Sequence, residues 1–203
     1  MSIRRALVVI DVQNEYFSGS LLVDHPPREG SLQNVLRGID AAREADIPVV
    51  VVQHTAPSGS PVFDRGSASW TLHPEVARRP HDLLVEKSAA SALTRTTLHA
   101  WLRERAIDTI TLAGYMTQNC ILATALEAAH QDLNVEVLAD ATGAVAYTNA
   151  AGAASAEELH RAVHVVLESN FAAVLSTDAW LGHLRSGARP ARDNLLMSNL
   201  RSR

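Results

Sequence analysis

The 203-residue sequence contains one cysteine and one lysine. A single thiol excludes an internal disulfide framework and any zinc site built from several cysteines. Seventeen of the eighteen basic residues are arginine, so Lys87 is the only side chain with a primary amine. Codon bias is one explanation for this near absence of lysine. The other is that Lys87 occupies a position where a planar guanidinium cannot replace a compact ammonium.

Aromatic residues and excess charge are also scarce. Aromatic residues make up 4% of the chain and charged residues 20%, and the net charge is −4. This balance gives no electrostatic reason to expect a nucleic acid or a membrane as partner. Because 47% of the residues are hydrophobic, a chain of this length predicts one compact domain with a sizeable core.

Long hydrophobic runs are missing as well. The apolar segment 6–10 follows Arg4 and Arg5 and is too short for a secretory signal or a membrane span. An unpaired cysteine suits a reducing compartment better than an oxidising one. We therefore expect a cytoplasmic protein.

Short β-branched runs alternate along the chain with segments rich in Ala, Leu, Glu and Arg. Such alternation predicts βαβ units, in which a parallel sheet lies between two layers of helices. The loops 18–30 and 56–81 hold most of the proline, glycine, serine and histidine, and we expect them to border the active site. The expected strands are 7–12, 48–53, 83–86, 109–113, 135–139 and 173–176, and the expected helices are 31–45, 94–105, 120–131 and 156–169.

The end of the chain differs in composition from the rest. We expect one domain over residues 1–183 and an arginine-rich tail over residues 184–203, which has five arginines and one aspartate. A solvated tail is one interpretation of this segment. Docking onto another subunit is the other.

Three ionisable side chains each come just after a predicted strand: Asp11, Lys87 and Cys120. The carboxyl ends of parallel strands meet at one edge of a sheet, so we expect these side chains to converge. A carboxylate can accept the proton of a thiol, and an ammonium favours the thiolate, which is the nucleophile. Alone, the cysteine reads as a buried apolar residue and the aspartate as a turn former. Their joint occurrence favours catalysis.

Cys120 is also expected at the start of a helix. There, the positive end of the helix dipole lowers the pKa of a thiol. The unpaired backbone N–H groups of the same helix terminus could hold an oxyanion.

Three motifs surround these residues. They read Asp-Val-Gln-Asn-Glu-Tyr-Phe over 11–17, Glu-Lys-Ser-Ala-Ala-Ser-Ala-Leu over 86–93 and Gly-Tyr-Met-Thr-Gln-Asn-Cys-Ile over 114–121. They resemble, in this order, the Asp-x-Gln-x-(Asp/Glu)-Phe-Phe opening, the lysine segment and the Gly-x-x-Thr-x-x-Cys-Val nucleophile loop of the isochorismatase-like cysteine hydrolases. The resemblance extends roughly from Ala6 to Ala179.

This resemblance implies a three-layer αβα sandwich with a six-stranded parallel sheet. It also implies a catalytic triad of Asp11, Lys87 and Cys120. A cis peptide bond between Tyr115 and Met116 would direct the backbone amides of Met116 and Cys120 into an oxyanion hole. The implied activity is hydrolysis of a C–N bond in a small amide, ureido compound or lactam through a thioester.

Histidines raise the question of a metal. In the nicotinamidase branch of the family, an Asp-x-His pair and two further histidines hold a metal, whereas this chain reads Val52-Gln53-His54 and retains His73. Because glutamine is a weak metal ligand, we expect no catalytic metal and no cofactor. Glu157, His160 and His164 share a helix face at metal-ligand spacing. The expected interpretation is a solvated outer face.

Few residues point to the substrate, which we expect to be a small molecule. Phe17, Trp70 and Tyr115 lie in predicted loops and could form a pocket wall that stacks a flat or apolar group. Gln13 and Asn119 could form hydrogen bonds with an amide or a carboxylate.

Two other functions stay open: hydrolysis of a vinyl ether, as in true isochorismatases, and a non-catalytic role as a ligand-binding or scaffold protein. Because small α/β enzymes often self-associate, we also expect a homo-oligomer, either a dimer or a tetramer.

Overall fold

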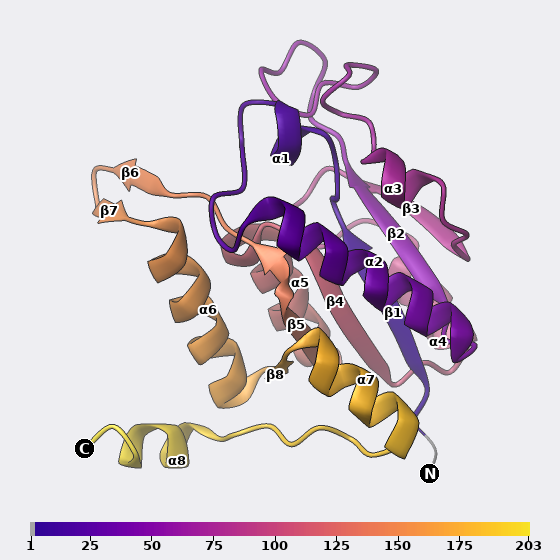
Figure 1. Ribbon diagram of the computed structural model, residues 1–203, viewed down its shortest axis with the longest axis vertical. Helices are drawn as coiled ribbons and strands as arrows, with labels where there is room; N and C mark the ends of the chain where they lie inside the picture. The colour runs from indigo at the N-terminus through magenta and orange to yellow at the C-terminus, as the bar shows by residue number, and fades with distance from the viewer. Residues whose placement is uncertain (1–2) are drawn as a thin grey trace.

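The computed structural model describes residues 3–203 and contains one six-stranded sheet in the order β3-β2-β1-β4-β5-β8 (Figure 1). Every neighbouring pair of these strands is parallel, which confirms the expected sheet. The strands are β1 (Arg5–Ile10), β2 (Val49–His54), β3 (Leu83–Lys87), β4 (Thr109–Tyr115), β5 (Asn134–Gly143) and β8 (Ala173–Leu175).

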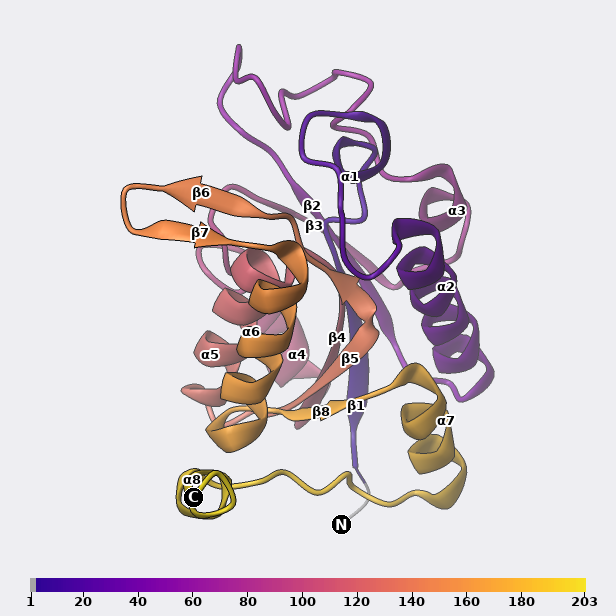
Figure 2. The ribbon, with the colours of Figure 1, turned by 60° about the vertical axis from the view of Figure 1, so that its left-hand side comes forward.

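Helices cover both faces of this sheet (Figure 2). One face carries α2 (Arg28–Glu44) and α7 (Thr177–Ser186), and the other carries α4 (Leu98–Glu104), α5 (Leu122–Ala129) and α6 (Ala156–Asn170). Side chains of a strand alternate between the faces, so Leu7 and Val9 belong to the core beneath α2, and Val8 to the core beneath α4 and α5. The three-layer αβα architecture is therefore confirmed.

Several elements lack a clear signal in the sequence. They are the short helices α1 (Glu15–Ser18) and α3 (Pro74–Ala77), the π-helical turn η1 (Thr117–Ile121), the hairpin of β6 (Tyr147–Asn149) and β7 (Gly152–Ala154), α7, and α8 (Leu195–Leu200). The hairpin projects from the body of the molecule beside the amino end of α6 (Figure 2). Within residues 3–203, every helix is too short or too polar to cross a bilayer.

A buried polar network closes the amino-terminal edge of the sheet. The Arg5 guanidinium donates to both carboxylate oxygens of Glu136, which also accept from Thr111 Oγ1 and Trp180 Nε1. These contacts join β1, β4 and α7 to β5. The polar groups at this edge are thus satisfied by one another, at the edge opposite the candidate site.

The arginine-rich segment crosses this same edge below the sheet (Figure 1). Arg189 Nη1 donates to Thr109 Oγ1 at 3.1 Å, and the Asp193 amide donates to Glu168 Oε1 at 3.2 Å. The expected boundary between residues 183 and 184 lies inside α7, which continues to Ser186. Residues beyond α7 therefore lie against the domain and end in α8 beneath α6.

The direction in which successive strands are added to the sheet reverses between β1 and β4. β2 and β3 extend the sheet on one side of this central pair, and β5 and β8 extend it on the other. Loops leaving the carboxyl ends of two strands at such a switch point diverge and leave a crevice. This is the edge where Asp11, Lys87 and Cys120 lie.

Candidate active site

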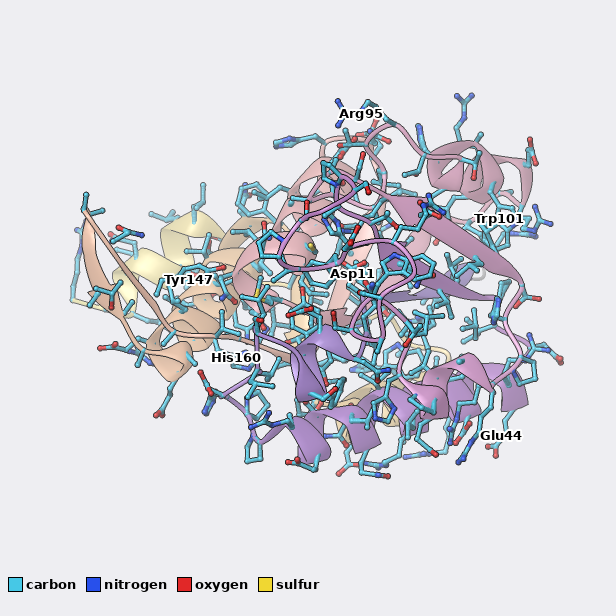
Figure 3. All side chains as sticks on the ribbon, turned by 90° about the horizontal axis from the view of Figure 1, so that it is seen from above. Asp11, Glu44, Arg95, Trp101, Tyr147 and His160 are labelled. Carbon is cyan, nitrogen blue, oxygen red and sulfur yellow. The ribbon has the colours of Figure 1, made fainter. Side chains whose placement is uncertain are left out.

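Asp11 is the first residue after β1, which ends at Ile10. Its φ of 51° is left-handed, and its amide still donates to Val52 O at 2.9 Å. A left-handed conformation is uncommon for a residue other than glycine, and it ends the strand two residues before the sequence pattern predicts. The turn leaves the carboxylate fully buried near the middle of the carboxyl edge (Figure 3).

Cys120 is held by η1 rather than by the first turn of a regular helix. The peptide bond between Tyr115 and Met116 is cis, as the resemblance implies. After it, the amides of Asn119 and Ile121 both donate to Met116 O, at 3.1 and 3.2 Å. Single π-helical turns of this kind are often found at functional sites. Cys120 is 3% exposed and α5 begins only at Leu122.

Lys87 joins the other two residues. Its Nζ lies 2.7 Å from Asp11 Oδ2 and 3.2 Å from Cys120 Sγ, and it also lies 3.1 Å from Ala89 O and 3.3 Å from His54 Nδ1. Among residues 3–203, neither oxygen of Asp11 has a donor with hydrogen-bond geometry, so its contact with Lys87 is an ion pair. The structure therefore brings all three predicted residues together out of contact with solvent.

Burial sets the protonation of this cluster. It raises the pKa of the Cys120 thiol to about 12, and the Asp11 charge acts in the same direction against Lys87. The expected lowering of this pKa by a helix terminus is therefore wrong, because desolvation disfavours the thiolate more than nearby positive charge favours it. Burial also raises the pKa of Asp11 against the effect of Lys87. Burial alone would lower the pKa of Lys87, but Asp11 and Cys120 raise it above its ordinary value.

The residues considered for a metal have other partners. Gln53 Nε2 donates to Trp70 O at 3.0 Å. His73 Nδ1 accepts from the Glu75 amide, and His54 Nδ1 faces Lys87. In the part of the chain that the structure describes, no three His, Cys, Asp or Glu side chains are grouped as metal ligands would be.

Gln13 and Asn119 occupy very different environments. The Gln13 amide accepts from the His54 N–H and donates to the carbonyl oxygens of His54 and Trp70, at 2.6 to 3.0 Å. Gln13 is fully buried, so these bonds commit it to holding the loops together rather than to a substrate. The side chain of Asn119 is exposed, and its contact with substrate stays a prediction.

The three predicted aromatic residues have different partners, and the pocket wall expected of them stays a prediction. Phe17 packs on Tyr115 with ring centroids 5.7 Å apart, whereas Trp70 Nε1 donates to Thr55 Oγ1. Tyr115 lies in β4 rather than in a loop and is fully buried, with its hydroxyl 2.8 Å from Ser31 Oγ. Tyr115 is therefore part of the buried core that supports the site.

Sequence reasoning missed two aromatic residues of this layer. Tyr16 packs on both Tyr115 and Phe63, and Phe63 in turn packs on His54. Burial raises the pKa of Tyr16, and the charges of Cys120 and Asp11 raise it further. Its position beside Phe17 in the first motif was the available signal. Phe63 had none, because the loop 56–81 has no periodic pattern.

The expectation of a solvated face on α6 is wrong for its histidines. His160 and His164 are each 8% exposed, and of the three residues considered only Glu157 is exposed. His160 Nδ1 lies 2.9 Å from Thr117 Oγ1, and His164 Nε2 lies 3.3 Å from Thr142 Oγ1. Histidine is apolar enough to pack and polar enough to bond, so periodicity alone could not assign its face.

Known proteins share this arrangement of strands, helices and loops. Residues 5–179 match the isochorismatase domain family. The chain belongs to this family. A protein from Burkholderia xenovorans LB400, provisionally called an isochorismatase, is 53% identical and superposes with a TM-score of 0.98 over 100% of this chain and 97% of that one.

More distant members of the isochorismatase family include amide-cleaving enzymes. A ureidoacrylate amidohydrolase from Variovorax paradoxus is 29% identical over 170 residues, which is 68% of this chain and 68% of the relative. N-carbamoylsarcosine amidase from Thermoplasma acidophilum is 25% identical and has a TM-score of 0.70, over 87% of this chain and 98% of that one. The resemblance seen in the sequence motifs is thereby confirmed at the level of the family, and both of these relatives are hydrolases by name.

Proposed function

We propose that this chain is a cysteine hydrolase that cleaves a C–N bond of a small amide, ureido compound or lactam. One observation carries the proposal: the Lys87 ammonium contacts both Asp11 Oδ2 and Cys120 Sγ, at 2.7 and 3.2 Å, and all three residues are buried. A thiol, a carboxylate and an ammonium at these distances can exchange a proton without exposing a bare charge to an apolar surrounding.

Attack starts from a neutral thiol. Because its pKa is about 12, Cys120 holds its proton at neutral pH until substrate arrives. The sulfur then bonds to the carbonyl carbon while the thiol proton passes to Asp11 and the carbonyl π electrons move to oxygen. The backbone N–H groups of Met116 and Cys120 are the donors we assign to that oxyanion. Lys87 stays charged and keeps Asp11 oriented.

Collapse of the tetrahedral intermediate breaks the C–N bond. Asp11 returns its proton to the departing nitrogen, and Cys120 is left as a thioester. The nitrogen leaves as ammonia or an amine from an amide or ureido compound, and from a lactam it becomes a free amine that stays attached to the acyl group. Asp11 then takes a proton from a water molecule that attacks the thioester carbon. The acid product leaves, and the proton on Asp11 goes back to the sulfur. The raised pKa of Asp11 suits a group that acts alternately as base and acid.

The choice of a C–N bond over an ether rests on the relatives and on the thiol. A ureidoacrylate amidohydrolase and N-carbamoylsarcosine amidase both act on C–N bonds by name. The name of the Burkholderia xenovorans protein favours the second candidate, hydrolysis of an isochorismate-like vinyl ether. That reaction has no need of a thioester, so it leaves the Cys120–Lys87 contact without a role.

A substrate panel with two product assays separates these candidates. Primary amides, ureido acids, lactams and isochorismate are incubated with the protein, and ammonia, amine and pyruvate are measured, with Cys120→Ala as the blank. We expect one class to give ammonia, a released amine or, for a lactam, the new amine of the ring-opened product. We expect none of these from Cys120→Ala, and a mass increase on Cys120 when the reaction is quenched in acid. Undiminished turnover by Cys120→Ala contradicts the proposal. Pyruvate release identifies the ether hydrolase, and the absence of any product supports a non-catalytic role.

A further inference from the structure

The turn that carries Cys120 is bonded to the helix layer behind it at its first residue. Thr117 begins η1 and is fully buried, and its Oγ1 lies 2.9 Å from His160 Nδ1 on α6. The proposed hydrolysis gives neither side chain a role. Figure 3 shows His160 to the side of Asp11, toward the hairpin that carries Tyr147.

Other bonds hold the later part of the turn. Gln118 Nε2 donates to Val145 O at 3.0 Å, and Cys120 O accepts from Thr124 Oγ1 at 2.7 Å. Thr117 and His160 therefore supply the side-chain bond at the point where β4 turns into η1. A displacement there is transmitted to Cys120, because only Gln118 and Asn119 separate Thr117 from Cys120 within the same turn.

His160 is itself held firmly. The α6 helix begins at a capping box in which Ser155 and Glu158 satisfy each other's backbone amides. The His160 ring packs against the rings of His164 and His25, with centroids 4.3 and 5.2 Å away. Burial and the neighbouring His25 lower its pKa to about 4, so the ring is neutral at pH 7 and shares one hydrogen bond with the Thr117 hydroxyl.

We propose that Thr117 and His160 are positioning residues for the nucleophile: their hydrogen bond fixes the start of η1 and thereby holds Cys120 Sγ against Lys87 and Asp11. This inference rests on the proposed function. Neither residue touches the reacting atoms, so the pair acts only through the placement of Cys120.

The same helix supplies a matched control. His164 and Thr142 form a second buried histidine–threonine pair at 3.3 Å, but Thr142 lies in β5 and not in the nucleophile turn. Removing either threonine hydroxyl leaves a buried histidine nitrogen without a side-chain partner, so the two changes are similar in kind for stability. Only the change at Thr117 alters the support of Cys120.

Steady-state kinetics on the substrate that the panel identifies compare the Thr117 and Thr142 variants. We expect Thr117→Val to lower kcat about tenfold or more with KM changed less than about twofold, because misplacing a reacting atom costs rate rather than binding. Thr142→Val should keep kcat within about twofold of that of the natural protein. Its melting temperature should be similar to that of Thr117→Val. Thr117→Ser, which retains the hydroxyl, should have a kcat much closer to that of the natural protein than Thr117→Val has.

A second measurement does not depend on turnover. Since the chain has one cysteine, [3-13C]cysteine labelling gives a single side-chain signal, from Cys120. We expect this signal to move in Thr117→Val and in His160→Leu. It should stay in place in Thr142→Val and return toward its natural position in His160→Asn, whose amide replaces Nδ1.

The two measurements keep the inference separate from the proposed function. If no substrate is turned over but the Cys120 signal moves only in the Thr117 and His160 variants, the positioning role holds and the proposed hydrolysis fails. An unmoved signal in Thr117→Val, or equal effects of Thr117→Val and Thr142→Val, overturns the inference. If Thr117→Val does not fold, Thr117→Ser and His160→Asn are compared with His160→Leu by the same signal.

Discussion

The Lys87 ammonium lies within 3.3 Å of four different atoms, from Asp11, His54, Ala89 and Cys120. An ammonium presents its donors around one nitrogen, which suits partners that converge on a point. A guanidinium is larger and planar and would meet these partners in the wrong directions. The single lysine of the chain therefore stands at a place where arginine does not fit, whatever removed lysine elsewhere.

Replacing Lys87 should destabilise the fold strongly. Lys87→Met leaves the Asp11 carboxylate buried without its cation, and breaking a buried pair in this way costs about 3–5 kcal/mol. Urea unfolding at pH 7 measures the loss. The double variant Lys87→Met with Asp11→Asn is the control, because it removes both charges and should recover most of the stability. A double variant as unstable as the single one would show that packing, and not the unpaired charge, is responsible.

Alkaline pH should weaken the fold partly through Cys120. The thiol has a pKa of about 12 when folded and an ordinary value of 9.0, so above pH 9 the folded state binds more protons than the unfolded state. The free energy of unfolding then falls as pH rises. Lys87, whose pKa is also raised, acts in the same direction above pH 10.5.

Cys120→Ala removes one of these groups. We expect its free energy of unfolding, measured by urea titration between pH 8 and 11, to fall less steeply with pH, by up to about 1.4 kcal/mol per pH unit. Identical slopes for the two proteins would mean that the folded thiol titrates near its ordinary pKa.

At the scale of elements, β1 and β4 approach each other closely at Gly114. Gly114 pairs with Ile10, and a Cβ built at Gly114 would lie 2.0 Å from Ile10 O. Its φ of +110° is also a conformation that other residues rarely adopt. Glycine at this position allows β4 to pass close to β1 before it turns into η1, which brings Cys120 to Asp11.

Gly114→Ala should therefore disrupt the central strand pair. We expect a loss of at least about 3 kcal/mol in the free energy of unfolding, because the clash is with backbone in the middle of the sheet. Gly66→Ala is the matched control, since Gly66 has a φ of +85° with nothing within 4 Å. Its loss should be only about 1 kcal/mol, the cost of the positive φ alone. Equal losses at both sites would contradict the close approach.

Periodicity located the long elements but not the short ones. The helix predicted over 156–169 matches α6 to within one residue, yet its inward face was misjudged because His160 and His164 count as polar. The turn η1 was read as the start of a helix, since no local pattern distinguishes an i→i+5 turn from an ordinary first turn. The sheet register that brings Asp11 and Lys87 together depends on residues far apart in sequence.

At the scale of the whole molecule, the amino-terminal and carboxyl-terminal edges of the sheet are built differently. The amino edge is closed by Glu136 and its donors and crossed by the segment after α7. The carboxyl edge holds the candidate site. The α8 helix at the end of the chain exposes four apolar side chains, Leu195, Leu196, Met197 and Leu200.

Self-association stays a prediction at this scale. We expect light scattering after size-exclusion chromatography to give a dimer or tetramer of the 21.9 kDa chain at micromolar concentration, because exposed apolar residues on a small α/β domain favour association. A mass equal to one chain across the concentration range would contradict it. The same measurement on a chain ending at Gly187 shows whether the arginine-rich segment takes part.

The sequence by itself determined the alternation of strands and helices, the family, and the residue types available for chemistry. These follow from local patterns, because burial on both faces of a strand selects β-branched runs and because Asp11, Lys87 and Cys120 end or follow such runs. Only the tertiary structure decided the pKa of Cys120, the roles of Gln13 and Tyr115, and the bond between Thr117 and His160. Each of these depends on which distant side chains exclude water from a group or supply its hydrogen bond, and a linear pattern does not record that.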